Sequence, residues 1–200
     1  MMLTRTLLIS LTILLLAGVG GYALYQGVAD RAQTSASACE TYENRENRRI
    51  LPMGAALPPL TLNTLEGQTF TLSEALRTPR VKMALIELFA TWCPHCKASV
   101  PTLRALQQSY GDRMLVLAVN AGDAAEEAST AIAFRDQYGV TYPILDRPSK
   151  DLIKGLCVSS FPTFYLVDKS GRIVWRHIGE LEASRRQALE KAIATVSRTP

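Results

Sequence analysis

The hydrophobic and polar positions of this chain divide it into an apolar segment near its start and an alternation of short strands and helices after it. Strands are predicted where apolar residues run together, and helices where they recur every three or four positions. Met83–Phe89 and Met114–Val119 are nearly continuous apolar runs, which is typical of strands buried on both faces of a sheet. We therefore expect an α/β fold with a mixed central β-sheet flanked by helices.

Turn residues and helix-ending glycines set the boundaries of the other predicted elements. Before the first buried strand, two alternating segments on either side of Glu66-Gly67 predict an N-terminal β-hairpin. The remaining predicted elements are, in chain order, a short helix over 74–76, a helix from Cys93 to about Tyr110, a strand at Met114–Val119, a helix over 124–138, a strand over 142–145, a short helix over 149–154, strands over 163–167 and 173–178, and a closing helix over 181–196.

Residues Leu7 to Val28 form an uncharged, mostly apolar segment that follows Arg5. About 20 apolar residues are enough to cross a bilayer as a helix, and a positive flank is typical of the cytoplasmic side. A cleaved signal sequence is the alternative, but its apolar core is usually only about 7–15 residues long. The length of the segment therefore favours an uncleaved anchor.

These patterns divide the chain into three regions. Residues 1–29 are predicted to be a transmembrane anchor or a signal sequence, residues 30–54 a polar tether, and residues 55–200 a single folded domain. The expected location is the inner (cytoplasmic) membrane, crossed once, with the domain in the periplasm or extracytoplasmic space. The membrane is therefore one expected partner.

The composition fits a globular domain and argues against nucleic-acid binding. The chain has 200 residues and a net charge of only +4. A nucleic-acid surface needs a dense basic stripe, whereas the basic residues of this chain are scattered. We therefore expect no nucleic-acid partner, and we expect a monomer.

Cys93 and Cys96 stand two residues apart, directly after a buried strand and at the start of a helix. The first amide groups of a helix lack helical partners, and its dipole is positive there, so a thiolate at Cys93 is stabilised. Pro94 fits the first helical turn because it has no N–H to lose. Cys93 would attack a disulfide of another protein, and Cys96 would resolve the resulting mixed disulfide.

The other two cysteines, Cys39 and Cys157, are single and far apart in the sequence. A zinc site would need a second ligand pair beside Cys93 and Cys96, so we expect no metal site. An even number of cysteines outside the cytoplasm suggests pairing, which predicts a structural disulfide between Cys39 and Cys157. Two free thiols are the alternative.

The stretch Phe89-Ala90-Thr91-Trp92-Cys93-Pro94-His95-Cys96 resembles the active site of the thioredoxin superfamily. Phe161-Pro162-Thr163 resembles the loop that this family places opposite the dithiol, with a cis proline. The resemblance implies a thioredoxin fold for residues 55–200. The segment between Met114 and Asp146 looks like the βα insertion of the TlpA/ResA branch. That branch groups membrane-tethered extracytoplasmic proteins, including reductases that serve cytochrome c maturation and copper-site assembly.

Two positions depart from the pattern of that branch. Its reductases usually have a glutamate where this chain has Ser99, and often an asparagine where it has Glu87. Glu87 resembles thioredoxin and the DsbA-type oxidants instead. Because Glu87 lies in an apolar run, burial should raise its pKa, and the acid could exchange protons with Cys96. An exposed glutamate at a sheet edge is the alternative.

The dipeptide Pro94-His95 also resembles the DsbA-type oxidants. A protonated His95 would stabilise the Cys93 thiolate by its charge, and a more stable reduced form makes the disulfide more oxidising. Trp92, Pro94 and His95 are therefore the residues expected to tune the reactivity of Cys93.

Cys93, Cys96, Glu87 and Pro162 are the predicted catalytic residues of a thiol–disulfide oxidoreductase that needs no cofactor besides its own redox-active disulfide. The expected partners are client proteins with thiols or disulfides and an unidentified membrane or periplasmic electron-transfer partner. The TlpA/ResA resemblance favours a reductase in cytochrome c maturation or metal-site assembly. The alternatives are a DsbA-like oxidant of secreted proteins and, in another class, a copper-binding chaperone that uses Cys93, His95 and Cys96.

Overall fold

The computed structural model describes residues 39–43, 45–122 and 128–198. The described residues all belong to one compact unit, Cys39–Pro200.

The predicted anchor or signal sequence at residues 1–29, and residues 30–38 of the predicted tether, lie outside the described residues. Within the described ranges, no helix is both long enough and apolar enough to cross a bilayer.

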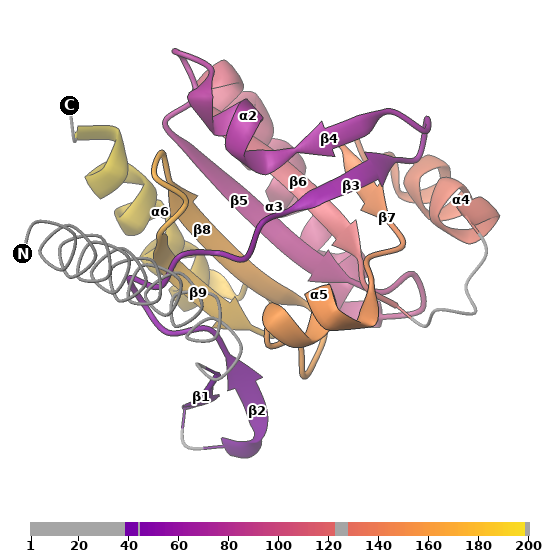
Figure 1. Cartoon of the computed structure of the whole chain (residues 1–200), viewed down its shortest axis with the longest axis horizontal. Coiled ribbons are helices and arrows are strands. Elements are labelled where there is room, and N and C mark those ends of the chain that lie inside the picture. Colours follow the sequence, from indigo (N-terminus) through magenta and orange to yellow (C-terminus); the bar gives the residue numbers. More distant parts are fainter. Residues whose placement is uncertain (1–38, 44, 123–127, 199–200) are drawn as a thin grey trace, which may run out of the picture. The chain divides into compact units, whose positions relative to one another are not determined.

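A seven-stranded mixed sheet forms the centre of the described domain (Figure 1). Its strands are β3 (Thr61–Thr64), β4 (Thr69–Thr71), β5 (Met83–Phe89), β6 (Met114–Asn120), β7 (Ile144–Asp146), β8 (Thr163–Asp168) and β9 (Ile173–Ile178). In the order β4-β3-β7-β6-β5-β8-β9, the strands β5, β6 and β7 run parallel, and the other neighbouring pairs are antiparallel. The pair β3–β4 confirms the predicted N-terminal hairpin.

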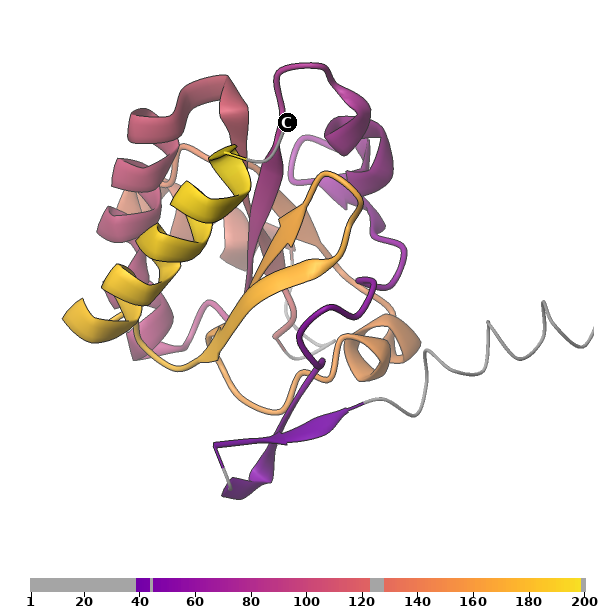
Figure 2. The same ribbon diagram turned by 90° about the vertical axis from the view of Figure 1, so that its left-hand side faces the viewer.

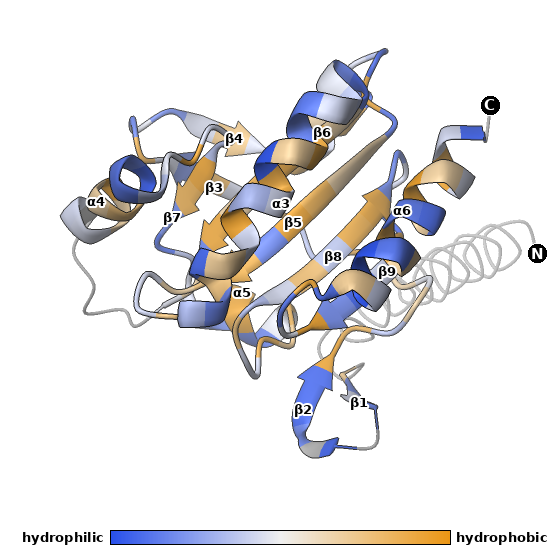
Figure 3. Cartoon of the chain, turned by 180° about the vertical axis from the view of Figure 1, so that it is seen from behind, coloured by the Kyte–Doolittle hydropathy of each residue, from blue (hydrophilic) through white to orange (hydrophobic). Residues whose placement is uncertain are grey.

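Helices cover both faces of this sheet (Figures 2 and 3). The helices are α2 (Leu72–Arg77), α3 (Pro94–Tyr110), α4 (Ala128–Tyr138), α5 (Lys150–Gly155) and α6 (Ala183–Arg198). Side chains of α3, α4 and α6 share one apolar cluster with the sheet, and side chains around α2 and α5 share a second cluster on the other face. The elements β6, α4 and β7 form the insertion that the sequence predicted.

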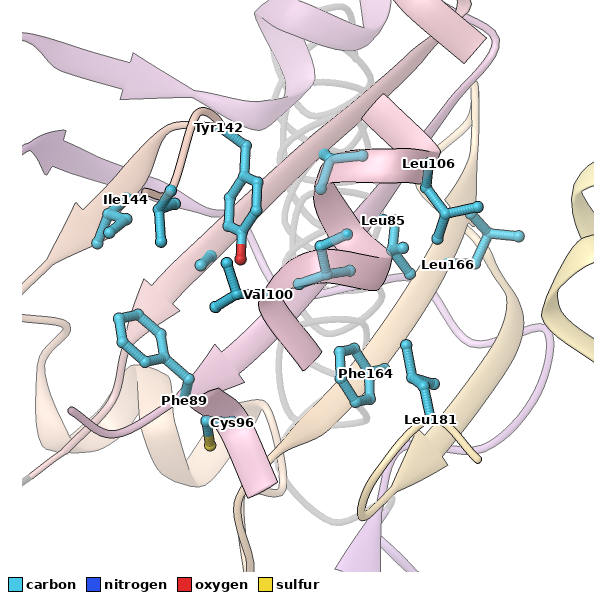
Figure 4. Packing of buried hydrophobic residues seen from close by; sticks show 14 of the residues in the cluster. Leu85, Phe89, Cys96, Val100, Leu106, Tyr142, Ile144, Phe164, Leu166 and Leu181 are labelled. Carbon is cyan, nitrogen blue, oxygen red and sulfur yellow. The ribbon is translucent and has the colours of Figure 1, made fainter. Parts of the chain in front are cut away.

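Strand β5 lies between β6 and β8, and all of its residues are buried. Leu85 and Phe89 face the apolar cluster beneath α3 and α6 (Figure 4), whereas Ile86 and Leu88 belong to the cluster on the opposite face. Because successive side chains of a strand alternate between faces, Glu87 lies on the same face as Leu85 and Phe89. The strand thus places one carboxyl group on the side of the sheet that carries α3.

Part of the segment 30–54, which the sequence predicted as a polar tether, forms a separate two-stranded sheet. Strand β1 (Glu40–Tyr42) pairs antiparallel with β2 (Arg45–Ile50). Tyr42 and Ile50 are only 6% and 0% exposed, and both belong to the apolar cluster near α2 and α5. The polar composition concealed this hairpin, because two apolar side chains are enough to attach a short, mostly polar pair of strands to the domain.

Covalent and polar contacts attach this hairpin to the domain. Cys39 forms a disulfide with Cys157, which is the pairing predicted from the sequence. Arg176 of β9 donates a hydrogen bond to the carbonyl oxygen of Leu51 and pairs with the carboxylate of Glu40. The compact unit therefore includes residues 39–54, which precede the predicted domain start at residue 55.

Candidate active site

The dithiol lies in the loop where β5 ends and at the start of α3. Cys93 is the N-cap of α3, and its Sγ accepts a hydrogen bond from the backbone N–H of Cys96, with Sγ and N 3.3 Å apart. Pro94 occupies the first helical turn, as expected. Both thiols are free and buried. The sulfur of Cys93 therefore lies at the positive end of the helix dipole, which stabilises a thiolate there.

Cys96 lies in a less favourable place for a negative charge. Burial raises the pKa of its thiol far above the ordinary value, and the charge of Glu87 raises it further. The two sulfurs therefore differ: Cys93 accepts an N–H hydrogen bond at the helix start, whereas Cys96 keeps its proton. Such an asymmetry suits a pair in which one sulfur attacks and the other resolves.

Glu87 is 2% exposed and lies opposite Ala118 of β6 and Phe164 of β8. Burial raises the pKa of its carboxyl group from 4.5 to about 8, so the group is mostly neutral near neutral pH. Its Oε1 has no hydrogen-bond partner among the described residues. The predicted burial of Glu87 is confirmed, and the alternative of an exposed edge position is wrong.

The loop before β8 contains the predicted cis proline. The bond between Phe161 and Pro162 is cis, and the carbonyl oxygen of Pro162 accepts a hydrogen bond from the backbone N–H of Gly179 at 2.9 Å. The ring of Phe161 meets the ring of Trp92 edge to face, with 5.8 Å between the ring centroids. This aromatic contact brings the cis-proline loop to the loop that carries the dithiol.

His95 occupies the first turn of α3, between the two cysteines, and its ring is turned toward a carboxylate. Its Nδ1 lies 3.0 Å from Oε2 of Glu180, which follows β9. The sequence predicted His95 as a tuning residue but did not indicate Glu180. These residues are 85 positions apart, and only the fold brings them together.

A cavity of about 530 Å³ adjoins the aromatic pair of Trp92 and Phe161. Ala121 and Ile153 contribute apolar walls, and Arg147 contributes a positive charge. Trp92 itself is 59% exposed, which is unusual for so large an apolar side chain. Among the residues that the structure describes, no cluster of three or more His, Cys, Asp or Glu side chains could hold a metal ion.

The fold and the dithiol at a helix start define a thioredoxin-like thiol–disulfide oxidoreductase. Residues 53–176 match the model of the AhpC/TSA family, and the chain belongs to that family.

Relatives and solved structures support the same class. The chain is 31% identical to the thioredoxin-like protein YneN of Bacillus subtilis (strain 168), over 87% of this chain and 90% of that protein. It is 26% identical to the thiol-disulfide oxidoreductase ResA of Bacillus thuringiensis (strain Al Hakam), over 88% of this chain and 89% of ResA. A crystal structure described as a thiol:disulfide interchange protein DsbE from Chlorobium tepidum superposes with a TM-score of 0.63 at 25% identity, covering 73% of this chain and 98% of that one. The predicted resemblance to TlpA/ResA proteins and the predicted thiol:disulfide interchange activity are confirmed.

Proposed function

We propose that Cys93 is the attacking thiol and Cys96 the resolving thiol of an enzyme that reduces disulfides in client proteins. The contrast between the two sulfurs carries this assignment. Cys93 accepts an N–H hydrogen bond at the start of α3, while burial and Glu87 keep the proton on Cys96.

The reaction transfers one electron pair from the dithiol to the client. The Cys93 thiolate attacks one sulfur of a client disulfide, which forms a mixed disulfide and releases one client thiolate. Cys96 then loses its proton and attacks the sulfur of Cys93, which forms the Cys93–Cys96 disulfide and releases the second client thiolate. An unidentified membrane or periplasmic partner with a thiol pair returns the electrons to the Cys93–Cys96 disulfide, which is the redox-active group.

Glu87 is proposed to carry the proton that Cys96 loses. Its carboxylate form accepts the proton when Cys96 attacks, and its neutral form returns one when the disulfide is reduced again. A pKa of about 8 suits both steps, because both forms are populated near neutral pH. A carboxylate with an ordinary pKa would hold almost no proton to return.

The client is proposed to bind between the cis-proline loop and the exposed ring of Trp92. The ring of Phe161 in this loop contacts Trp92, which precedes Cys93, and the cavity next to Phe161 can accept side chains that flank the client cysteine. Trp92 and Pro162 therefore contact clients in this proposal, while Cys93 reacts with them.

The proposed location is the extracytoplasmic face of the inner membrane. The uncharged segment from Leu7 to Val28 supports an anchor. The disulfide between Cys39 and Cys157 supports an oxidising compartment, because such cross-links rarely persist in the cytoplasm.

The direction of electron flow has two candidates. The insertion formed by β6, α4 and β7 supports a reductase of the TlpA/ResA type, which would serve cytochrome c maturation or metal-site assembly. The dipeptide Pro94-His95 and the buried Glu87 favour the second candidate, a DsbA-like oxidant. We favour reduction. In cells that lack the protein, the clients of a reductase accumulate as disulfides, whereas the clients of an oxidant accumulate as free thiols.

Trapping tests the assignment of the two cysteines. We expect Cys96→Ala to accumulate mixed disulfides between Cys93 and its clients, because the resolving sulfur is missing. Cys93→Ala is the matched control and should trap nothing. Equal trapping by both variants, or none by Cys96→Ala, would contradict the proposal. The clients can be identified by mass spectrometry of the adducts, and their thiol state in deletion cells then decides the direction.

A further inference from the structure

Glu180 lies in the turn that follows β9, and two hydrogen bonds hold this turn in place. The N–H of Gly179 donates to the carbonyl oxygen of Pro162 at 2.9 Å, which joins this turn to the cis-proline loop. The carbonyl oxygen of Glu180 lies 3.0 Å from Nε2 of His177. The backbone under Glu180 is therefore fixed relative to the active-site loops.

His177 is a buried anchor for this turn. It is 5% exposed, and burial lowers the pKa of its imidazole, so the neutral ring is favoured. A neutral ring that donates from Nε2 to the carbonyl of Glu180 has a free lone pair on Nδ1, which lies 2.7 Å from the hydroxyl of Tyr42. The hydroxyl can donate to that nitrogen, so both ring nitrogens have partners.

The side chain of Glu180 reaches the first turn of α3. Its Oε2 lies 3.0 Å from Nδ1 of His95, and the two side chains are 44% and 65% exposed respectively. A carboxylate can only accept, so Nδ1 of His95 must carry the hydrogen. This N–H is directed to Glu180, and it is not available to the sulfur of Cys93.

We propose that Glu180 is a positioning residue that holds the His95 ring and offsets its positive charge, which makes the Cys93–Cys96 disulfide less oxidising than the Pro94-His95 dipeptide alone implies. The inference rests on the proposed role of Cys93 as the attacking thiol. Without Glu180, no carboxylate offsets a positive charge on the His95 ring, and that charge would stabilise a Cys93 thiolate at the same helix start more strongly. A more stable reduced form makes the disulfide a stronger oxidant.

The size of the effect follows from the exposure of the pair. Ion pairs between solvent-exposed groups contribute modestly, so we expect the redox equilibrium constant against glutathione to change about two- to fivefold. All variants are compared at the same pH and ionic strength.

The test is a double-mutant cycle on the full chain, with Glu180→Gln, His95→Gln and the double variant equilibrated against reduced and oxidised glutathione. We expect Glu180→Gln to be about two- to fivefold more oxidising than the wild type, and to have little effect in the His95→Gln background. Glu182→Gln is the control, because Glu182 is an exposed carboxylate in the same segment and should change nothing. The rate of Cys93 alkylation should rise in Glu180→Gln in parallel.

Two results would overturn the inference. An unchanged equilibrium in Glu180→Gln would show that the carboxylate has no influence on the dithiol. An equal change with and without His95 would show that Glu180 acts directly on Cys93 and not through the ring. Failure of the wild type to form any Cys93–Cys96 disulfide would instead overturn the proposed function, and the inference with it.

Discussion

Glu87 shows at the scale of one residue how the fold changes the chemistry of a side chain. The strand around it is apolar, and its two neighbouring strands contribute Ala118 and Phe164 opposite it. Glu87 is only 2% exposed, and this burial raises the pKa of its carboxyl group to about 8. The same group on the surface would be a permanent anion and could not exchange protons with Cys96 at neutral pH.

Replacing Glu87 with Gln keeps the size of the side chain but removes the group that accepts the proton. We expect Glu87→Gln to resolve a preformed mixed disulfide on Cys93 about 100-fold more slowly at neutral pH. This factor is at the lower end of the range by which a general acid or base accelerates a reaction. In the wild type the rate should rise as the pH approaches 8, because the carboxylate form becomes populated. Rapid quenching of a model-peptide mixed disulfide measures both the rate and its pH profile.

Ser99→Ala is a suitable control for that experiment. Ser99 is also buried in the region of the dithiol, but its hydroxyl donates to the carbonyl oxygen of His95 and not to a sulfur. We expect this variant to keep the pH profile of the wild type. A pH profile of Glu87→Gln that matches the wild type would show that water carries the proton.

The sequence predicted those site residues whose environment is local. Cys93, Cys96 and Pro94 are recognisable because a buried strand precedes them and a helix follows, and the burial of Glu87 follows from its apolar neighbours. Glu180 could not be predicted in this way. Its contact with His95 depends on the register of β9 and on the turn after it, and one sequence contains no signal for either.

At the scale of elements, the large sheet could be predicted because its sequence signals are local, whereas the small sheet of β1 and β2 could not. Strand β5 (Met83–Phe89) is predictable because it is buried on both faces, so its composition alone marks it. Helix α3 (Pro94–Tyr110) is predictable from the proline at its start and from Gly111, which caps its end with a positive φ of 55°. Strands β1 and β2 are not predictable from the sequence. Most of their residues are polar, and the residues that hold them in place are distant in sequence.

The disulfide between Cys39 and Cys157 should stabilise the domain by fastening this hairpin. Replacing both cysteines with Ser should lower the free energy of unfolding by about 2–5 kcal/mol, because a long loop in the unfolded chain is no longer closed. Urea titration of the double variant against the wild type measures this loss. A non-reduced digest should contain the linked peptide, and its absence would contradict the pairing.

At the scale of the whole molecule, unfolding should depend on pH through Glu87. Its carboxyl group has a pKa of about 8 in the folded domain and 4.5 as the ordinary value. The unfolded chain therefore releases this proton first as the pH rises. The contribution of Glu87 to the free energy of unfolding is therefore greatest below pH 4.5. It decreases as the pH rises toward 8, by no more than roughly 1.4 kcal/mol per pH unit.

Urea titrations of the wild type and of Glu87→Gln at several pH values check this expectation. The difference in the free energy of unfolding between the two proteins reports the contribution of Glu87, because the other titratable groups are present in both. His177 is one such group: its lowered pKa makes stability fall as the pH drops below 6.5, which is the opposite direction. A difference that does not vary between pH 4.5 and 8 would contradict a raised pKa at Glu87.

Each of the two cysteine pairs has one member at a helix end, and the two ends differ: Cys93 lies at an N-terminus and Cys157 follows a C-terminus. Cys93 opens α3, where the dipole favours a departing or attacking thiolate, whereas Cys157 comes just after α5 (Lys150–Gly155), where the carbonyl end disfavours one. A disulfide whose thiols leave slowly exchanges slowly. Electrons delivered by a partner should therefore reduce Cys93–Cys96 and spare the cross-link at Cys157, so that a single chain can hold one pair reduced and the other oxidised in the same compartment.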